Sequence, residues 1–154
     1  MRHRWSTVGV VCVGVALCCV LLGGCGKSDY RVAPVSGKVT LDGKAVPNLA
    51  VTFQPLRTDN NPNPGPGSAG RTDDQGNYEL KLLDPNVKDV KDLRKGAVVG
   101  KQSVTFVRMA PQSQSDMETP LAPDPVLDPI VGKWRKEVEV PAAGKKDMDF
   151  ELKQ

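Results

Sequence analysis

The sequence predicts an all-β protein, a β-sandwich with long loops rich in Pro and Gly, preceded by a signal peptide. Hydrophobic residues alternate with polar ones at a period of two in several short segments, which is typical of half-buried strands. Turn-forming residues separate these segments, and prolines concentrate in two long stretches between them. Together these features indicate six or seven short strands and little helix, which is the profile of a β-sandwich.

The first strand is expected at residues 35–41, where Val35, Val39 and Leu41 fall on one face. Asp42-Gly43 follows directly and predicts a hairpin turn, because glycine adopts positive φ at little cost. A second strand is expected at residues 51–55, where hydrophobic and polar residues again alternate.

The next segments combine loops and one strand. Residues 56–70 are rich in Asn, Pro and Gly and predict a long loop. Residues 71–82 predict a tight turn and then a strand with Tyr78, Leu80 and Leu82 on the core face. In this turn we expect aspartates to accept backbone N–H bonds beside a glycine at positive φ, since their spacing does not fit a calcium loop.

The second half leaves one alternative open. Residues 84–96 predict either a helix of two or three turns beginning at Asp84-Pro85 or a polar loop. A strand is expected at residues 101–109, followed by a proline-rich loop over residues 110–129. The tail alternates at 138–140 and again at 148–152, which predicts a terminal hairpin around Pro141-Ala142-Ala143-Gly144.

The start of the chain has the order of a secretory signal. A basic start precedes an apolar run over residues 8–22, which is shorter than the ~20 residues needed to span a bilayer. Leu22-Gly23-Gly24-Cys25 then resembles the lipobox of bacterial lipoproteins. The resemblance implies that the Cys25 thiol is lipidated, that the leader is cut before Cys25, and that acyl chains such as palmitate anchor the protein. The alternatives are an uncleaved anchor helix and an ordinary secreted protein.

Cleavage before Cys25 would remove 24 of the 154 residues and leave 19 basic and 18 acidic side chains. This near-balance points to no nucleic-acid partner. All four cysteines lie at or before Cys25, and His3 is the only histidine. The mature chain therefore offers no imidazole or thiolate for zinc or for nucleophilic catalysis, and we expect no metal, no cofactor and no enzymatic activity. A carboxylate-dependent hydrolase is the enzymatic alternative.

Several motifs together resemble a known family. Val35-Ser36-Gly37-Lys38-Val39-Thr40, Leu41-Asp42-Gly43-Lys44-Ala45-Val46-Pro47 and Thr72-Asp73-Asp74-Gln75-Gly76-Asn77-Tyr78 look like the opening motifs of carboxypeptidase regulatory-like domains, which are similar to transthyretin. The resemblance implies a seven-stranded, prealbumin-like sandwich and does not imply catalysis. The expected organisation is a lipoprotein signal peptide at 1–24, a lipidated N-terminus and tether at 25–34, and this domain at 35–154.

These features predict a non-catalytic cell-envelope lipoprotein that displays its domain for structural or binding purposes. Its expected partners are the membrane, through the lipid anchor, and an envelope protein or glycan. One alternative is a carbohydrate-binding module that uses Trp134, the only tryptophan after the leader. Another is an interaction module that accepts a partner strand at a sheet edge. Gly26 after the cysteine favours the outer membrane, by the sorting convention of the lipoprotein family.

Overall fold

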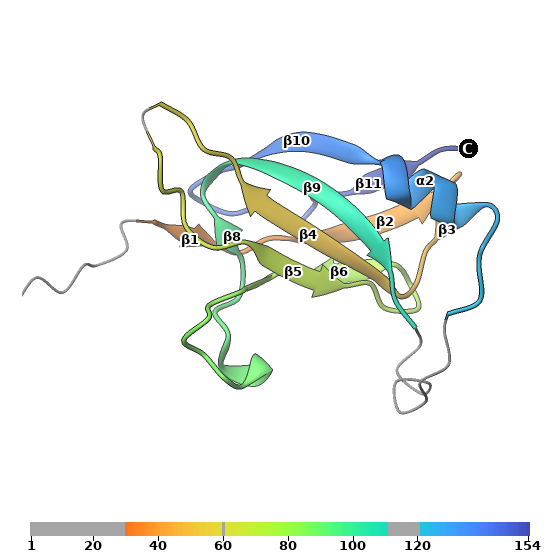
Figure 1. Ribbon diagram of the computed structural model, residues 1–154, viewed down its shortest axis with the longest axis horizontal. Coiled ribbons are helices and arrows are strands. Elements are labelled where there is room, and N and C mark those ends of the chain that lie inside the picture. The colour runs from red at the N-terminus through yellow and green to blue at the C-terminus, as the bar shows by residue number, and fades with distance from the viewer. Residues whose placement is uncertain (1–29, 60, 111–120) are drawn as a thin grey trace, which may run out of the picture.

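The regular secondary structure of the described chain is mostly β-strand, arranged in three sheets, with one short α-helix (Figure 1). The computed structural model describes residues 30–59, 61–110 and 121–154. The predicted all-β class is confirmed. In chain order the elements are β1 (Val32–Ala33), β2 (Ser36–Leu41), β3 (Lys44–Ala45), β4 (Leu49–Pro55), β5 (Ser68–Arg71), β6 (Asn77–Glu79), β7 (Lys81–Leu82), the 3₁₀ turn η2 (Val90–Asp92), β8 (Ala97–Val98), β9 (Gly100–Arg108), α2 (Leu127–Lys133), β10 (Arg135–Val140) and β11 (Phe150–Leu152).

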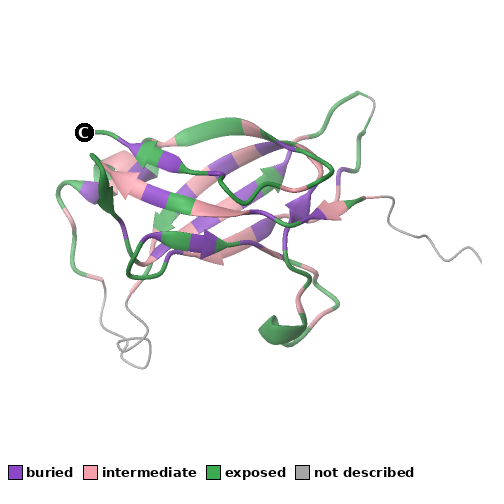
Figure 2. Cartoon of the chain, turned by 180° about the vertical axis from the view of Figure 1, so that it is seen from behind, coloured by how far each residue is buried: buried purple, intermediate pink, exposed green. Residues whose placement is uncertain are grey.

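The largest sheet is antiparallel and has the strand order β10-β9-β4-β5-β7. Its centre is the long pair β4–β9, in which Val51 lies opposite Phe106 and Phe53 lies opposite Val104. All four side chains are buried, because residues two apart on a strand share a face. Buried and less buried positions alternate along these strands in Figure 2.

The second sheet centres on β2, which pairs with β11, β3 and β6. Asp42 and Gly43 connect β2 to β3 with φ values of 47° and 81°, so the predicted hairpin turn is confirmed. The pairing of β11 with β2 is parallel, with Phe150 opposite Val39. A third, two-stranded sheet joins β1 to β8.

The core between the two larger sheets is built around Phe150. Its ring centroid lies 5.4 Å from that of Trp134, 5.5 Å from Phe106, 6.1 Å from Phe53 and 6.3 Å from Tyr78. These residues come from β4, β6, β9, β11 and the end of α2, so one aromatic cluster ties both sheets together.

The predicted terminal hairpin is wrong. Strand β10 pairs with β9 in the large sheet, whereas β11 lies in the other sheet beside β2. The chain crosses between sheets after a turn at Gly144, whose φ is 82°. The Lys145 N–H then bonds the Pro34 carbonyl at 2.9 Å, and Met148 N–H bonds the Ser36 carbonyl at 3.0 Å. Alternation in the tail indicated two strands correctly but did not specify their partners.

The turn at residues 71–77 is confirmed in detail. One Asp73 carboxylate oxygen accepts the backbone N–H groups of Asn77 at 2.8 Å and Gln75 at 2.9 Å, and Gly76 has a φ of 79°. The hydrogen bond from the Asn77 backbone is the main cause that lowers the pKa of Asp73. The carboxylate is therefore occupied by the turn's own backbone.

The predicted strand after this turn is divided between sheets. β6 pairs with β2, and β7 pairs with β5, while Tyr78, Leu80 and Leu82 are all buried as expected. The preceding loop is shorter than predicted, because β5 already begins at Ser68. Gly70 suits this strand, since a Cβ there would lie 2.4 Å from the Glu79 carbonyl oxygen.

Two further expectations are decided by the structure. Residues 84–96 form the polar loop, with only the short η2 turn, so the two- or three-turn helix is wrong. The predicted loop over 110–129 is also wrong at its end, because α2 begins at Leu127. Its third residue is Pro129, which is tolerated because the first helical N–H groups have no partner within the helix.

Candidate functional site

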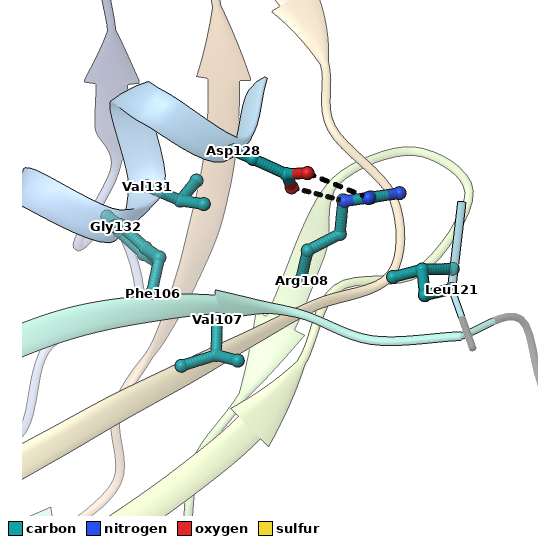
Figure 3. A pocket seen from close by; sticks show the side chains of 7 residues that line it. All are labelled: Phe106, Val107, Arg108, Leu121, Asp128, Val131 and Gly132. Atoms are coloured by element: carbon teal, nitrogen blue, oxygen red, sulfur yellow. Dashed lines mark hydrogen bonds and ion pairs between the residues drawn. The ribbon is translucent and has the colours of Figure 1, made fainter. Parts of the chain in front are cut away.

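The helix α2 lies against β9 and forms a shallow groove with it, which we call the α2–β9 groove (Figure 3). Two adjoining hollows of about 350 and 450 Å³ make up the groove. They share the lining residues Phe106 and Val107 from β9 and Val131 and Gly132 from α2. A Cβ built on Gly132 would meet no atom within 4 Å, so this glycine borders open space.

The start of α2 is fixed by carboxylates. The Asp124 side chain accepts hydrogen bonds from the backbone N–H groups of Val126 and Leu127, at 3.0 and 2.8 Å. This satisfies N–H groups that the first helical turn leaves free. Leu127 and Val131 then lie buried on the face that joins the core. The helix is therefore held by these two hydrogen bonds from its first N–H groups to Asp124 and by an apolar stripe.

A salt bridge joins α2 to the end of β9. Arg108 Nε donates to Asp128 Oδ1 at 2.6 Å, and its Nη2 donates to Asp128 Oδ2 at 3.0 Å. The hydrogen bond from Arg108 is the main cause that lowers the pKa of Asp128, and it raises the pKa of Arg108 in turn. Each side chain uses its charged atoms to bond the other, so the pair links α2 to β9 at one end of the groove.

Trp134 follows α2 directly and lines the larger hollow beside Thr105, Lys133 and Arg135. Its ring is half-buried and lies 4.5 Å from the Phe106 ring, centroid to centroid, at an angle of 46°. A second contact reaches Phe150 in an edge arrangement. Part of the indole thus belongs to the core, and the remainder contributes to the groove wall.

A second arginine, Arg71, also fixes the chain near the groove through hydrogen bonds. Arg71, at the end of β5, donates to the Asn48 side-chain oxygen at 2.7 Å and also to the Ala110 carbonyl. Arg71 and Arg108 therefore fix the chain on both sides of the segment 111–120. No sequence signal pointed to these arginines, because their partners are distant or are backbone atoms.

The sequence did contain a signal for α2. Leu127, Ile130, Val131 and Trp134 have the i, i+3, i+4, i+7 spacing of one helix face, and Asp124 stands in front of them. The five prolines of residues 110–129 favoured a loop instead. The α2–β9 groove was missed for the same reason.

The structure describes one of the two predicted site residues and not the other. Trp134 lies at the groove, whereas Cys25 lies outside the described residues. Across residues 30–59, 61–110 and 121–154, no group of three or more Asp, Glu, His or Cys side chains could hold a metal ion. In the same ranges, no helix has the length and hydrophobicity to cross a membrane.

The groove can offer an apolar floor with a partly cationic rim. Phe106 and Val131 supply the floor, whereas Val107 points away from α2 and is largely exposed (Figure 3). Lys133 and Arg135 line the larger hollow. The carboxylate in this lining, Asp128, is paired with Arg108. Comparisons of the chain with protein families, with curated proteins and with solved structures find no match.

Proposed function

We propose that the chain is a non-catalytic, lipid-anchored protein of the cell envelope that displays its β-domain for structural or binding purposes. The observation that carries this proposal is the sequence Leu22-Gly23-Gly24-Cys25 at the end of an apolar run. The position of the fold along the chain supports it, since β1 begins seven residues after Cys25. A leader cut before Cys25 would leave every described strand in the mature protein.

The proposed domain is a seven-stranded, prealbumin-like sandwich of the carboxypeptidase regulatory-like type. Its support is the pair of larger sheets that share one aromatic core, together with the tight turns at Asp42-Gly43 and at residues 73–77. These turns lie in the motifs that carry the family resemblance. The outer membrane is the proposed location, with an envelope protein or a glycan as partner.

The chemistry of the described residues supports a non-catalytic role. The ionisable groups with shifted pKa values are Asp73, Tyr78, Arg108 and Asp128. Each is engaged in a contact that holds the fold: a turn, a core hydrogen bond, or the tie between α2 and β9. Perturbed groups at catalytic sites keep their reactive atoms free, whereas Arg108 and Asp128, although they line the groove, are bonded to each other.

A second candidate function is carbohydrate binding at Trp134. The specific observation is that the indole borders the larger hollow, beside Lys133 and Arg135. Aromatic faces are the surfaces on which sugar rings stack, and here Phe106 and Phe150 cover part of the ring. Titration with a glycan panel would shift Trp134 fluorescence if the exposed part binds sugar, and an unchanged spectrum together with no retention would exclude this candidate.

The test of the principal proposal is the intact mass of the membrane-extracted protein beside a Cys25→Ser variant. We expect the mass of residues 25–154 plus a lipid adduct for the wild type, and an unprocessed chain for the variant. A wild-type protein without a lipid adduct would overturn the proposal. A Cys18→Ser variant is the matched control, because it changes a leader cysteine and should leave processing intact.

A further inference from the structure

The loop between β7 and β8, residues 83–96, exposes hydrophobic side chains that the core does not use. We call it the η2 loop, after the 3₁₀ turn that it contains. Val90 is 65% exposed and Leu83 is 46% exposed, and no residue of η2 is buried. Single exposed hydrophobics are ordinary on a protein surface, so their surroundings decide what they indicate.

The η2 loop also carries an excess of positive charge. It holds four basic residues and three aspartates, a net charge of +1, and the Lys81 side chain donates to the Val90 carbonyl oxygen at 3.3 Å. Lys91 pairs with Asp89 at 3.1 Å, and Lys95 pairs with Glu79 at 2.9 Å. The basic residues of the loop are Lys88, Lys91, Arg94 and Lys95.

The loop leaves the fold next to the strand at which the chain enters it. β8, which ends the loop, pairs with β1 through Val32 opposite Val98 and Ala33 opposite Ala97. Gly96 is so close to β1 that a Cβ there would lie 2.1 Å from the Ala33 carbonyl oxygen. The η2 loop projects from the half of the molecule that holds β1, whereas α2 and β3 lie at the other end (Figure 1).

The chain length between Cys25 and β1 limits how far the half of the molecule that holds β1 can lie from the lipid surface. Val32 lies seven positions after Cys25, and a fully extended chain of that length reaches at most about 25 Å. A lipidated Cys25 would therefore keep β1 and the η2 loop close to the lipid surface. At this range a tethered surface has a high effective concentration, so weak contacts become occupied.

We propose that the η2 loop is the membrane-facing surface of the domain, with Val90 at the interface and the loop's basic residues against anionic lipid headgroups. This inference rests on the proposed lipid anchor at Cys25. Basic residues are attracted to an anionic lipid surface over about one Debye length, roughly 10 Å, and apolar side chains add to this attachment. In this orientation the α2–β9 groove points away from the membrane and stays open to partners.

The experiment uses the processed, lipidated full protein in vesicles that contain phosphatidylglycerol. A Val90→Cys variant is labelled with an environment-sensitive fluorophore, since a lipidated Cys25 has no free thiol. The control is Lys44→Cys, labelled in the same way in β3 at the far end. We expect a blue-shifted emission, protected from aqueous iodide, at position 90 and an iodide-accessible probe at position 44.

Charge-reversal variants distinguish an effect of the loop's own basic residues from a general attraction of the protein to the vesicle. Lys88→Glu with Arg94→Glu is expected to abolish the blue shift at position 90, whereas Lys44→Glu with Lys133→Glu should preserve it. Equal iodide accessibility at positions 90 and 44 in a lipidated protein would overturn this inference alone. A protein whose mass shows no lipid adduct would overturn the proposed anchor and this inference with it.

Discussion

Tyr78 places a polar atom inside the aromatic core and satisfies it there. Its hydroxyl donates a hydrogen bond to the Met148 carbonyl oxygen at 2.6 Å, and the residue is 3% exposed. We expect Tyr78→Phe to lower the free energy of unfolding by about 1–3 kcal/mol, because a buried carbonyl loses its donor. Urea unfolding measures this change. Tyr30→Phe is the control and should have little effect, since the described structure gives the Tyr30 hydroxyl no hydrogen bond.

The same residue predicts how stability depends on alkaline pH. Burial is the main cause that raises the pKa of Tyr78 above its ordinary value of 10.0, and the charge of Asp149 adds to the shift. The unfolded chain therefore loses the phenolic proton at lower pH than the folded protein. The contribution of Tyr78 to stability is complete below pH 10 and declines above it. Equal alkaline slopes for the wild type and Tyr78→Phe would contradict this account.

At the scale of elements, α2 depends on a salt bridge that acid can break. The pKa of Asp128 is lowered, chiefly by its hydrogen bond from Arg108. The pair therefore stabilises α2 at pH values above 3.8, the ordinary pKa of an aspartate, and this stabilisation is lost as the pH falls below that value. We expect Asp128→Asn to loosen α2 at neutral pH. The fluorescence of Trp134, which follows the helix directly, should shift to longer wavelength and become more accessible to a soluble quencher.

The matched control for α2 is Asp74→Asn, an exposed carboxylate outside the groove whose side chain makes no hydrogen bond or ion pair in the described structure. It should leave the Trp134 spectrum unchanged. The wild type should show the same red shift below about pH 4 that Asp128→Asn shows at pH 7. An identical response of all three proteins to acid would mean that the pair does not hold the helix.

Elements set by local chemistry could be predicted from the sequence. The hairpin at Asp42-Gly43, the turn at Asp73 and the buried face of residues 78–82 follow from turn residues and alternation, and the structure confirms each. β4 and β9 were predicted for the same reason. In such segments the local sequence alone determines the structure.

Elements set by distant contacts could not be predicted. Pairing of β11 with β2 joins residues more than 100 positions apart, and alternation in β11 is equally compatible with a hairpin. The η2 loop has a helical spacing of Val87, Val90 and Leu93, but no apolar surface covers it, and short helices need such packing. The α2–β9 groove depends on a helix concealed among prolines and on the pairing of Arg108 with Asp128.

At the scale of the whole molecule, the last strand of the chain completes the core that the first strands begin. β11 pairs with β2, and Phe150 stands at the centre of the aromatic cluster. Met148, Phe150 and Leu152 are all buried, and each such side chain contributes about 1.5–3 kcal/mol. The three together amount to about 4.5–9 kcal/mol, which is comparable with the entire stability of a domain of this size.

Truncation after Gly144 should therefore abolish cooperative unfolding, even though ten of the eleven described strands remain. The reason is that β2 loses its parallel partner and the Tyr78 hydroxyl loses the Met148 carbonyl. Truncation after Leu152 is the control, because it removes only Lys153 and Gln154, which are exposed. Thermal melts followed by circular dichroism should show a sharp transition for the control and a gradual one for the shorter chain. A sharp transition in both would mean that the two sheets stay packed together without β11, and that Phe150 is not required for cooperative unfolding.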